Sequence, residues 1–202
     1  MDVVCLDLEG VLIPEIWIAF AEKTGIEALR ATTRDIPDYD ELMTLRLGLL
    51  KENNLKLSDI QEVIATLEPL PGALSFLDKL RENYQVIILS DTFYEFAKPF
   101  MKQLHWPTLF CHQLEIDVEG VVIGYKLRQP DPKKISVQSL HQLKFRVFAA
   151  GDSYNDTTML AEADQGFLFR APKKVVDEFP QYPVTNQYDE LRSFFDNASS
   201  QI

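Results

Sequence analysis

The sequence predicts an α/β fold in which helices surround a parallel β-sheet. Four short apolar runs, each followed by polar or turn residues, have the composition of buried parallel strands. They span residues 3–6, 86–89, 147–150 and 166–169. Segments with helical periodicity separate these runs, and this alternation is typical of parallel sheets. Because ligands bind at the carboxyl ends of such strands, Asp7, Ser90 and Asp152 fall where a site is expected.

The helices are predicted from apolar spacing and from residues that favour helix starts. Leu74, Leu77 and Leu80 share one face of a helix that begins near Gly72. Pro132 suits the first position of a later helix. The predicted helices in this part of the chain span residues 72–84, 94–104, 132–141 and 156–163.

Residues 14 to about 70 interrupt the alternation, because they carry three helical patterns and no convincing strand. Ser58 to Gln61 looks like a capping box that starts the last of these helices. We interpret residues 14–70 as a helical cap inserted into a core of residues 1–13 and 71–202.

Two further segments lie outside the regular pattern. Residues 114–125 contain two apolar stretches around Glu119 and Gly120, which predicts a β-hairpin. The C-terminal part, residues 173–202, is expected to add a helix near 187–197 and then to fray.

The composition of the chain indicates which kinds of partner it can bind and in which cell compartment it is expected. The net charge of −11 disfavours nucleic acid and anionic membranes. Cys5 and Cys111 form no disulfide framework, which fits a reducing cytoplasm. The N-terminus lacks the basic start of a signal peptide, and no apolar run approaches ~18 residues. We therefore expect a cytoplasmic protein that does not span a membrane.

The strongest single signal is the Asp7-Leu8-Glu9-Gly10 segment, directly after the first strand. Two carboxylates two residues apart can divide the work of phosphoryl transfer, one attacking phosphorus and the other protonating the leaving group. Taken alone, a polar turn after a strand explains these residues better.

Three further signals follow in order along the chain. Ser90 and Asp91 offer a hydroxyl and backbone N–H groups to a phosphoryl oxygen, although a helix N-cap is the simpler explanation. Lys133 or Lys134 could neutralise the charge of such a group. Their spacing does not show which of the two would do so, and a solvated lysine on a helix surface explains either one equally well. Residues 151–156 crowd carboxylates and an amide into one turn, an oxygen-rich cluster that suits Mg²⁺.

The order of these four signals resembles the motifs of the haloacid dehalogenase-like hydrolases. The resemblance covers residues 3–172 and implies a Rossmann-like core with an inserted helical C1-type cap. More narrowly, residues 5–20, 87–94 and 150–160 resemble phosphoserine phosphatases, including the type that also transfers the phosphoryl group to homoserine.

The resemblance implies an Mg²⁺-dependent enzyme that forms an aspartyl-phosphate on Asp7. Asp7, Asp152 and the main-chain carbonyl of Glu9 would hold the metal. Glu9 would protonate the leaving group and then deprotonate the attacking water. Most of the family has aspartate at this place, and we hypothesise that the longer glutamate lets an acceptor hydroxyl, as of homoserine, compete with water.

Phosphate binding is assigned by the same resemblance. Ser90, the N–H of Asp91 and Lys133 would hold the phosphoryl oxygens. Asn155 would orient the phosphate, and Asp156 would orient it or neighbouring side chains, a role the sequence does not define further.

Recognition of O-phospho-L-serine is expected in the cap. Glu15 would bind the ammonium group, and Arg46 would bind the carboxylate through its fork of N–H donors. Without the resemblance, Glu15 is explained by charge compensation at a helix N-terminus and Arg46 by an exposed helix position.

Other side chains near the motifs are expected to be structural. Aromatic residues there are more typical of packing than of substrate contact; they are Trp17, Phe20, Phe93, Tyr94 and Phe96. The three histidines lack metal-ligand spacing and are expected to be structural or surface residues; they are His105, His112 and His141.

Other functions fit parts of the pattern. A phosphatase for another small phosphomonoester would use the same chemistry. A receiver-like signalling domain also combines an aspartate, a serine or threonine and a lysine, but it has no use for a helical lid or for Glu9. A silent scaffold is disfavoured because all expected carboxylates are present. The sequence leaves open whether water or homoserine accepts the phosphoryl group and whether the chain forms a homodimer.

Overall fold

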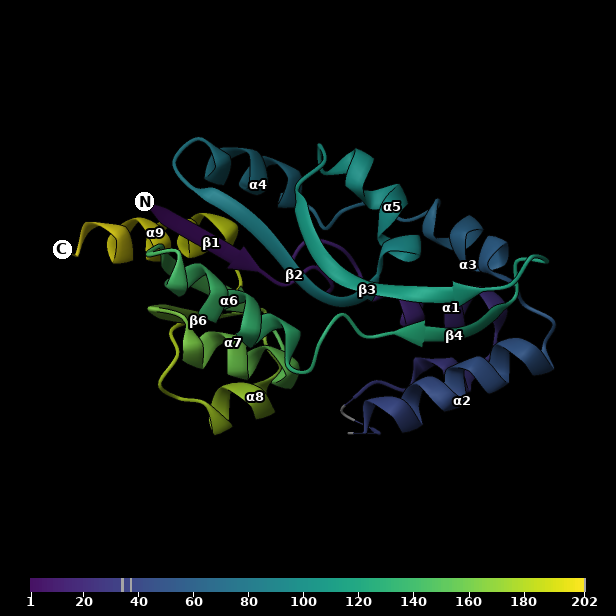
Figure 1. The fold of residues 1–202 in the computed structure, drawn as a ribbon. Coiled ribbons are helices and arrows are strands. Elements are labelled where there is room, and N and C mark those ends of the chain that lie inside the picture. The colour runs from purple at the N-terminus through teal and green to yellow at the C-terminus, as the bar shows by residue number, and fades with distance from the viewer. Residues whose placement is uncertain (34, 37, 202) are drawn as a thin grey trace.

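The computed structural model describes residues 1–33, 35, 36 and 38–201. Within these residues the chain forms one seven-stranded sheet with the order β4-β3-β2-β1-β5-β6-β7 (Figure 1). All neighbouring strands pair in parallel except β3 and β4, which form an antiparallel hairpin. The strands are β1 (Asp2–Leu6), β2 (Gln85–Phe93), β3 (Thr108–Ile116), β4 (Val122–Lys126), β5 (Arg146–Gly151), β6 (Gln165–Phe169) and β7 (Val184–Thr185).

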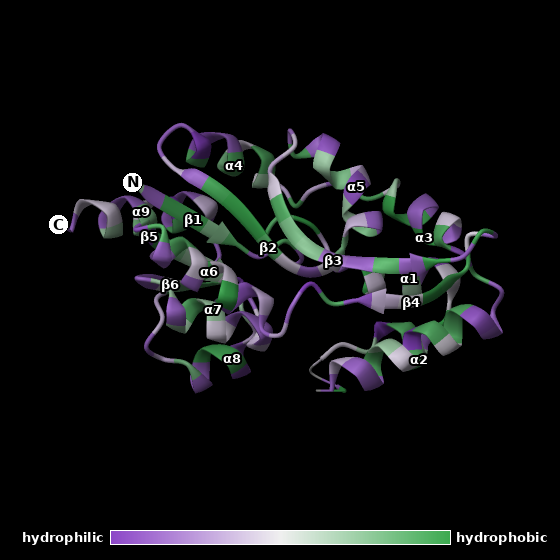
Figure 2. Cartoon of the chain, in the orientation of Figure 1, coloured by the Kyte–Doolittle hydropathy of each residue, from purple (hydrophilic) through white to green (hydrophobic). Residues whose placement is uncertain are grey.

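Helices cover both faces of the sheet, because side chains alternate along each strand and both sets are apolar. Val4 and Leu6 of β1 pack in a core with α4 (Ala73–Arg81), α5 (Tyr94–Gln103) and α9 (Tyr188–Ser200). Val3 and Cys5 pack on the opposite face with α6 (Pro132–Gln142), α7 (Thr157–Glu162) and α8 (Lys173–Glu178). In Figure 2 the central strands β1 and β2 have largely hydrophobic colours.

The segment between β1 and α4 is helical and lies beyond the carboxyl end of β2 (Figure 1). It contains α1 (Ile16–Thr24), the 3₁₀ helix η1 (Glu27–Arg30), α2 (Tyr39–Glu52) and α3 (Leu57–Ile64). The β3–β4 hairpin reaches this segment, where the N–H of Leu57 donates to the carbonyl of Gly120 at 3.0 Å. Lys56 Nζ donates to the carbonyl of Glu119, also at 3.0 Å. Two positions of the expected cap, 34 and 37, lie outside the described residues.

The main sequence predictions of regular structure are confirmed. The four predicted strands correspond to β1, β2, β5 and β6, and the four predicted helices to α4, α5, α6 and α7, with the short 3₁₀ helix η2 (Tyr154–Asp156) leading into α7. The hairpin turn is also present, because Gly120 adopts a φ of 82° between β3 and β4. Asp117 Oδ1 stabilises this turn by accepting the N–H groups of Glu119 and Val121.

The capping box predicted at Ser58 and Gln61 is wrong. α3 begins at Leu57, and the Asp59 carboxylate accepts the N–H of Lys56 at 2.6 Å, so the capped first turn lies two residues earlier than predicted. Gln61 instead reaches α5, where its Nε2 donates to the carbonyl of Glu95 at 2.9 Å.

Two parts of the sheet were not predicted. β3 begins at Thr108, well before the expected hairpin, and its first half pairs in parallel with β2. Beyond β6, α8 and the two-residue β7 precede the expected C-terminal helix, which continues as α9 to Ser200. α8 and β7 are short, so their pattern in the sequence is weak.

β2 continues past its predicted end at Leu89 and bulges before it ends at Phe93. Leu89 pairs with Phe110 and Phe93 with His112, so four steps along β2 correspond to two along β3. The helix-cap explanation of Ser90 is therefore wrong, because α5 starts only at Tyr94 and no side chain caps it. A bulge of this kind turns side chains out of the regular alternation, often beside a site.

The two ends of the described chain are held together by a charged contact. Asp2 accepts hydrogen bonds from Arg146 at 2.9 and 2.6 Å and from Ser199 Oγ at 2.6 Å. These bonds join β1, β5 and α9. Among the described residues, the helices are too short or too polar to cross a bilayer.

We expect Asp2→Asn to lower the free energy of unfolding by about 1 kcal/mol at neutral pH. Burial raises the pKa of Asp2, but the bonds from Arg146 and Ser199 outweigh it and leave the pKa below its ordinary value. The stabilisation is therefore present above the unfolded pKa and is lost as the pH falls through the lower folded value.

Urea unfolding of both proteins at neutral pH and in acid measures this loss. Asp189→Asn is the matched control, because Asp189 is almost fully exposed and lies 3.9 Å from Lys79. A difference between native and Asp2→Asn proteins that persists undiminished in acid would contradict the assignment.

Candidate active site

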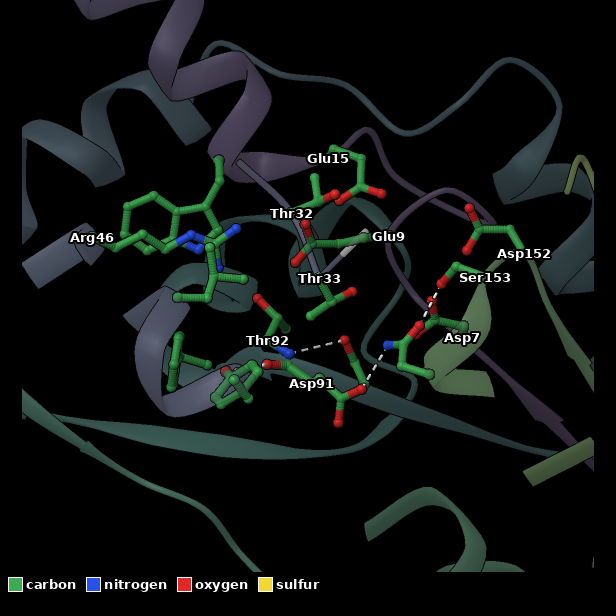
Figure 3. Close-up of a pocket in the computed structure, with 16 residues that line it drawn as sticks. Asp7, Glu9, Glu15, Thr32, Thr33, Arg46, Asp91, Thr92, Asp152 and Ser153 are labelled. Carbon is green, nitrogen blue, oxygen red and sulfur yellow. Dashed lines mark hydrogen bonds between the residues drawn. The ribbon is translucent and has the colours of Figure 1, made fainter. Parts of the chain in front are cut away.

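A cavity opens at the carboxyl ends of β1, β2 and β5, under the helical segment (Figure 3). The structure brings eight of the nine expected site residues to its walls. They are Asp7, Glu9, Glu15, Arg46, Ser90, Asp91, Asp152 and Asn155. The ninth, Lys133, is buried beside them and contacts Asp7.

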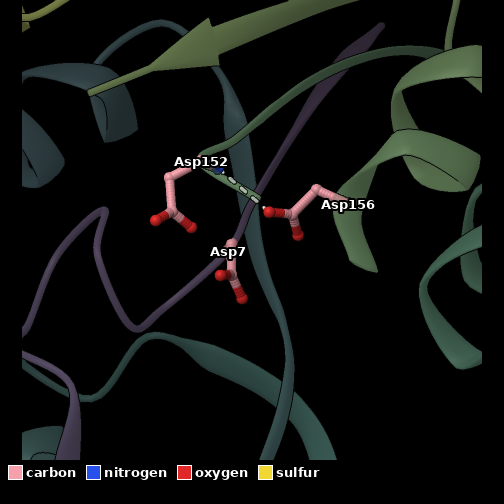
Figure 4. Close-up of side chains that lie close together, drawn as sticks. All are labelled: Asp7, Asp152 and Asp156. Carbon is pink, nitrogen blue, oxygen red and sulfur yellow. Dashed lines mark hydrogen bonds between the residues drawn. The ribbon is translucent and has the colours of Figure 1, made fainter. Parts of the chain in front are cut away.

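Three buried carboxylates meet at the base of this cavity (Figure 4). Oxygen atoms of Asp7, Asp152 and Asp156 lie within 4.8 Å of one another. The pairing of β1 with β5 brings them together, since the N–H of Asp7 donates to the carbonyl of Ala150 at 3.0 Å. Burial raises the pKa of Asp7, as does the negative charge of Asp156, while Lys133 opposes both.

Lys133 connects this cluster to helix α6. Its Nζ lies 2.9 Å from Asp7 Oδ1, 2.6 Å from Asp156 Oδ1 and 3.4 Å from Asp91 Oδ2. Burial by itself would lower the pKa of Lys133, but the three carboxylates raise it well above its ordinary value. The side chain is therefore an ammonium group at neutral pH. Lys134, which spacing alone could not separate from it, is partly exposed.

Asp156 organises the turn after β5. Its Oδ2 accepts the N–H groups of Asp152 and Ser153, each at 3.0 Å, while Oδ1 accepts Lys133. Gly151 makes this turn possible, because a Cβ there would lie 2.3 Å from the carboxyl carbon of Asp156. With three donors already bound, Asp156 has little capacity left to bind a metal.

The donor set fits a hard divalent cation. Carboxylate oxygens are the ligands that such ions prefer. Asp7, Asp152 and Asp156 face the single ammonium group of Lys133 within the cluster, so buried negative charge is in excess. Uncompensated buried charge is costly, and a divalent cation would offset it.

Gly10 allows the loop after β1 to approach the acidic cluster. Its φ is 77°, and a Cβ at this position would lie 2.5 Å from Asp152 Oδ2. The loop folds back on itself, since the N–H of Gly10 donates to the carbonyl of Ile13 at 2.8 Å. From α9, the hydroxyl of Tyr188 donates to the carbonyl of Val11 at 2.6 Å and fixes the loop.

Glu9 is partly buried where this loop meets the helical segment. Its Oε2 accepts the N–H of Ile16, the first residue of α1, at 2.9 Å. Burial raises the pKa of Glu9 to about 7, and the nearby carboxylate of Glu15 adds to this rise. Glu9 can therefore exchange a proton near neutral pH, as an acid–base group must.

The bulge of β2 presents polar groups to the cavity. Ser90 is buried, and its Oγ accepts the N–H of Thr92 at 3.2 Å, so its own proton can point elsewhere. The carboxylate of Asp91 accepts Asn155 Nδ2 at 2.7 Å. The sequence analysis predicted a role only for the backbone N–H of Asp91 and did not predict the contact of its side chain with Asn155.

Arg46 enters the cavity from α2 as a buried cation. Only 7% of the residue is exposed, so the exposed-position explanation of Arg46 is wrong. Its guanidinium carbon lies 4.6 Å from the centre of the Trp17 ring, and Nη2 donates to the carbonyl of Ala31 at 3.0 Å. Within the described part of the chain, Nε has no hydrogen-bond partner. Burial lowers the pKa of Arg46 to about 10, which still leaves it charged at neutral pH.

Glu15 faces the same part of the cavity as Arg46 (Figure 3). It occupies the N-cap position of α1, but its side chain makes no capping hydrogen bond. Compensation of the helix N-terminal charge needs no such bond, so that explanation of Glu15 stays a prediction.

Several lining residues were not predicted as such. Trp17 and Phe93 line the cavity although they were expected only to pack. Thr32, Thr33 and Tyr39 come from the helical segment and belong to no motif. Thr32 and Thr33 lie in a loop and Tyr39 at the start of α2, where no periodic signal marks them, so only the fold could place them here.

The comparison with protein families agrees with this geometry. Residues 1–164 match the model of the haloacid dehalogenase-like hydrolases. This chain belongs to that family. The match includes β1, the bulge of β2, Lys133 and the turn after β5, which together form the base of the cavity in this hydrolase.

Two relatives of the hydrolase match almost its full length. One is named phosphoserine phosphatase ThrH, from Pseudomonas aeruginosa; it is 65% identical over 200 residues, which cover 99% of this chain and 98% of the relative. The other is named phosphoserine phosphatase, from Pseudomonas syringae pv. tomato; it is 62% identical, over 99% of this chain and 84% of the relative.

Solved structures share the fold of the hydrolase. An analogue of the phospho-aspartyl intermediate of a phosphoserine phosphatase superposes with a TM-score of 0.79 at 18% identity, covering 96% of this chain and 98% of that one. A substrate-bound complex of a phosphoserine phosphatase has the same TM-score and identity, covering 97% of both chains. At this identity the similarity concerns the fold alone.

We expect Gly10→Ala to weaken the binding of a divalent cation about tenfold or more, because the added methyl group would displace Asp152. Gly25→Ala is the matched control: its φ is 70°, but open space surrounds it. Both changes strain the backbone by about 1 kcal/mol. Calorimetric titration with Mg²⁺ separates them, and equal dissociation constants for the two variants would contradict the assignment.

Proposed function

We propose that this hydrolase removes the phosphate of O-phospho-L-serine in an Mg²⁺-dependent reaction through an aspartyl-phosphate on Asp7. The observation that carries the proposal is a single cavity with Asp7 at its base and the buried cation Arg46 in its wall. The carboxylate of Asp7 can attack the phosphorus atom of phosphoserine, and the guanidinium of Arg46 can bind its carboxylate at the other end of the molecule. The 65% identity to a protein named phosphoserine phosphatase ThrH supports the same substrate.

Asp7, Asp152 and the main-chain carbonyl of Glu9 would hold the Mg²⁺ ion. The burial of Asp7 and Asp152 and the excess negative charge of the cluster support this assignment. The ion, when bound, offsets the repulsion between an anionic nucleophile and an anionic phosphate.

The first step is attack of an Asp7 oxygen on phosphorus. The bond from phosphorus to the serine oxygen breaks, and Glu9 gives its proton to that oxygen. Water then attacks the aspartyl-phosphate, Glu9 takes a proton from it, and the products are inorganic phosphate and the free Asp7 carboxylate. The pKa of Glu9, raised to about 7 by burial, suits both directions of this transfer.

Phosphoryl oxygens are bound by Ser90, the N–H of Asp91 and Lys133, and Asn155 orients them. The buried ammonium of Lys133, 2.9 Å from Asp7, supports this role because it lies beside the nucleophile. Such fixed charges act mainly on the transition state, where charge on the phosphoryl oxygens is spread.

Substrate recognition is assigned to the helical segment, which we treat as a cap of residues 14–70 on a core of 1–13 and 71–202. Arg46 binds the substrate carboxylate, which would supply a partner for its Nε. Glu15 binds the ammonium group, and its uncapped side chain in the cavity supports this. A cytoplasmic location and recognition of a small molecule rather than nucleic acid complete the proposal.

Transfer of the phosphoryl group to homoserine is a second candidate activity. Glu9 supports this activity. Its side chain, which is longer than that of aspartate, extends from the loop after β1 to the N–H of Ile16 at the start of the cap. An acceptor hydroxyl bound in place of serine would meet the same base as water.

The test is phosphate release from L-phosphoserine with Mg²⁺, with and without homoserine. We expect release that depends on the metal and is lost in Asp7→Asn, and phosphohomoserine when the acceptor is present. Asp7→Asn removes the nucleophile and is expected to lower the rate by about a thousandfold or more. Full turnover by Asp7→Asn, or no release from phosphoserine by the native enzyme, would refute the proposal.

We expect Arg46→Ala to raise KM for phosphoserine roughly a hundredfold, because a buried charge-assisted contact with the carboxylate is lost. KM for p-nitrophenyl phosphate, which has no carboxylate, should change little. Arg30→Ala is the control, since Arg30 lies in an exposed ion pair with Glu22. Equal effects of Arg46→Ala on both substrates would count against carboxylate recognition.

Glu9→Gln is expected to lower kcat for phosphoserine about a hundredfold or more, because the serine alkoxide needs a proton as it leaves. Nitrophenolate leaves without one, so single-turnover formation of the phosphoenzyme from p-nitrophenyl phosphate should fall far less. Rapid-quench measurement with both substrates makes this comparison. A loss of the same size for both would show that Glu9 is not the acid.

A further inference from the structure

His112 is a buried histidine beside the site that the mechanism does not use. It lies on β3 at 2% exposure. The rings of Tyr39 and Phe93 pack around it, at centroid distances of 6.4 and 6.3 Å. Its Nδ1 accepts the N–H of Arg128 at 3.1 Å. In the neutral ring the proton is therefore on Nε2, which lies 3.5 Å from Asp91 Oδ1.

The other oxygen of Asp91 faces the groups assigned to phosphate. Asp91 Oδ2 accepts Asn155 Nδ2 at 2.7 Å and lies 3.4 Å from Lys133 Nζ. Burial alone would raise the pKa of Asp91, but Lys133, His112 and Asn155 bring it well below its ordinary value. The carboxylate thus bridges His112 on one side and two phosphate-binding side chains on the other.

We propose that His112 is a positioning residue that fixes the carboxylate of Asp91 and, through it, the amide of Asn155 and the ammonium group of Lys133. This inference rests on the proposed function, because it concerns the phosphate-binding groups of the same site. His112 does not line the cavity that holds Glu9 and Arg46; it lines an adjoining cavity, which shares Asp91 and Asn155 with the first and also contains Lys133. Its connection to these phosphate-binding groups is through the carboxylate of Asp91.

His112 can fix the carboxylate of Asp91 because it adds a hydrogen bond to the second of its two oxygens. The main chain of Asp91 is held by the bulge of β2 and by Tyr39, whose hydroxyl donates to its carbonyl at 3.1 Å. The carboxylate can still rotate about its last bond unless both oxygens are bound. His112 binds the oxygen that Asn155 does not, so the amide of Asn155 keeps one orientation before phosphate arrives. Preorganised binding groups lose less entropy on binding.

A purely structural role for His112 makes a different prediction. If the ring only fills space between Tyr39 and Phe93, an apolar side chain of similar size should serve as well as a polar one. If the Nε2 proton is what matters, a side chain that carries an N–H donor should restore function. His112→Gln and His112→Met form a matched pair, because they have similar length, but only Gln keeps an N–H donor for Asp91, together with an acceptor oxygen for the N–H of Arg128.

The measured quantities are the dissociation constant of inorganic phosphate with Mg²⁺, by calorimetry, and kcat and KM for phosphoserine. We expect His112→Met to weaken phosphate binding about tenfold and His112→Gln to stay within about threefold of the native enzyme. Because Arg46 is untouched, binding of L-serine, measured in the same way, should be equal in the two variants.

A double-mutant cycle tests whether His112 affects phosphate binding through Asp91. In an Asp91→Asn background, His112→Met should change phosphate binding less than about twofold, because the group through which it acts is altered. Multiplicative effects of the two changes would overturn the proposal, and so would equal phosphate binding by the Met and Gln variants. If His112→Met does not fold, His112→Phe replaces it in both comparisons, since Phe keeps the ring and lacks the donor.

Failure of this inference is distinct from failure of the proposed function. A native enzyme that neither binds phosphate with Mg²⁺ nor hydrolyses phosphoserine refutes the function. A native enzyme that does both, with His112→Met indistinguishable from it, refutes only the role of His112.

Discussion

The contact between Lys133 and the buried carboxylates is the constraint on which the rest of the site depends. It joins three distant parts of the chain: Asp7 at the end of β1, Asp156 in the turn after β5, and α6, which carries the lysine. A buried ammonium group is stable only with such partners, and the carboxylates likewise need a positive charge. Because one lysine faces three acids, the cluster keeps a negative excess that favours a divalent cation. Structure and chemistry therefore depend on the same charges.

The second constraint is the attachment of the helical segment to the sheet through strand β3. β3 begins as a parallel strand of the core and ends as half of a hairpin that bonds to Lys56 and Leu57. The bulge of β2 lies beside the middle of β3 and directs Ser90, Asp91 and Thr92 away from a regular ladder. Groups from the core and from the helical segment can then meet in one cavity. Tyr39 marks this junction, because its hydroxyl reaches the carbonyl of Asp91.

Much of the fold was predictable because its signals are local. Apolar runs before Asp7, Ser90 and Asp152 indicated the strands, and their parallel pairing follows from the alternation with helices. The same rule places the residues after the strands at one edge of the sheet, where the structure finds them. The capping box at Ser58 failed for a local reason as well: Asp59 accepts the N–H of Lys56, and the helix therefore starts two residues earlier.

The sequence by itself determined which chemical groups are present and in which order, since strand ends and helix starts are encoded by short-range patterns. Only the tertiary structure decided which of these groups are buried together. Lys133 and Lys134 are neighbours with the same side chain, yet one is buried among carboxylates and the other is partly exposed. Arg46 and His112 carry no motif, and their burial arises from packing against residues far away in the chain. Burial changes the pKa and the hydrogen-bonding needs of a side chain, and it is a property of the folded molecule that no short stretch of sequence specifies.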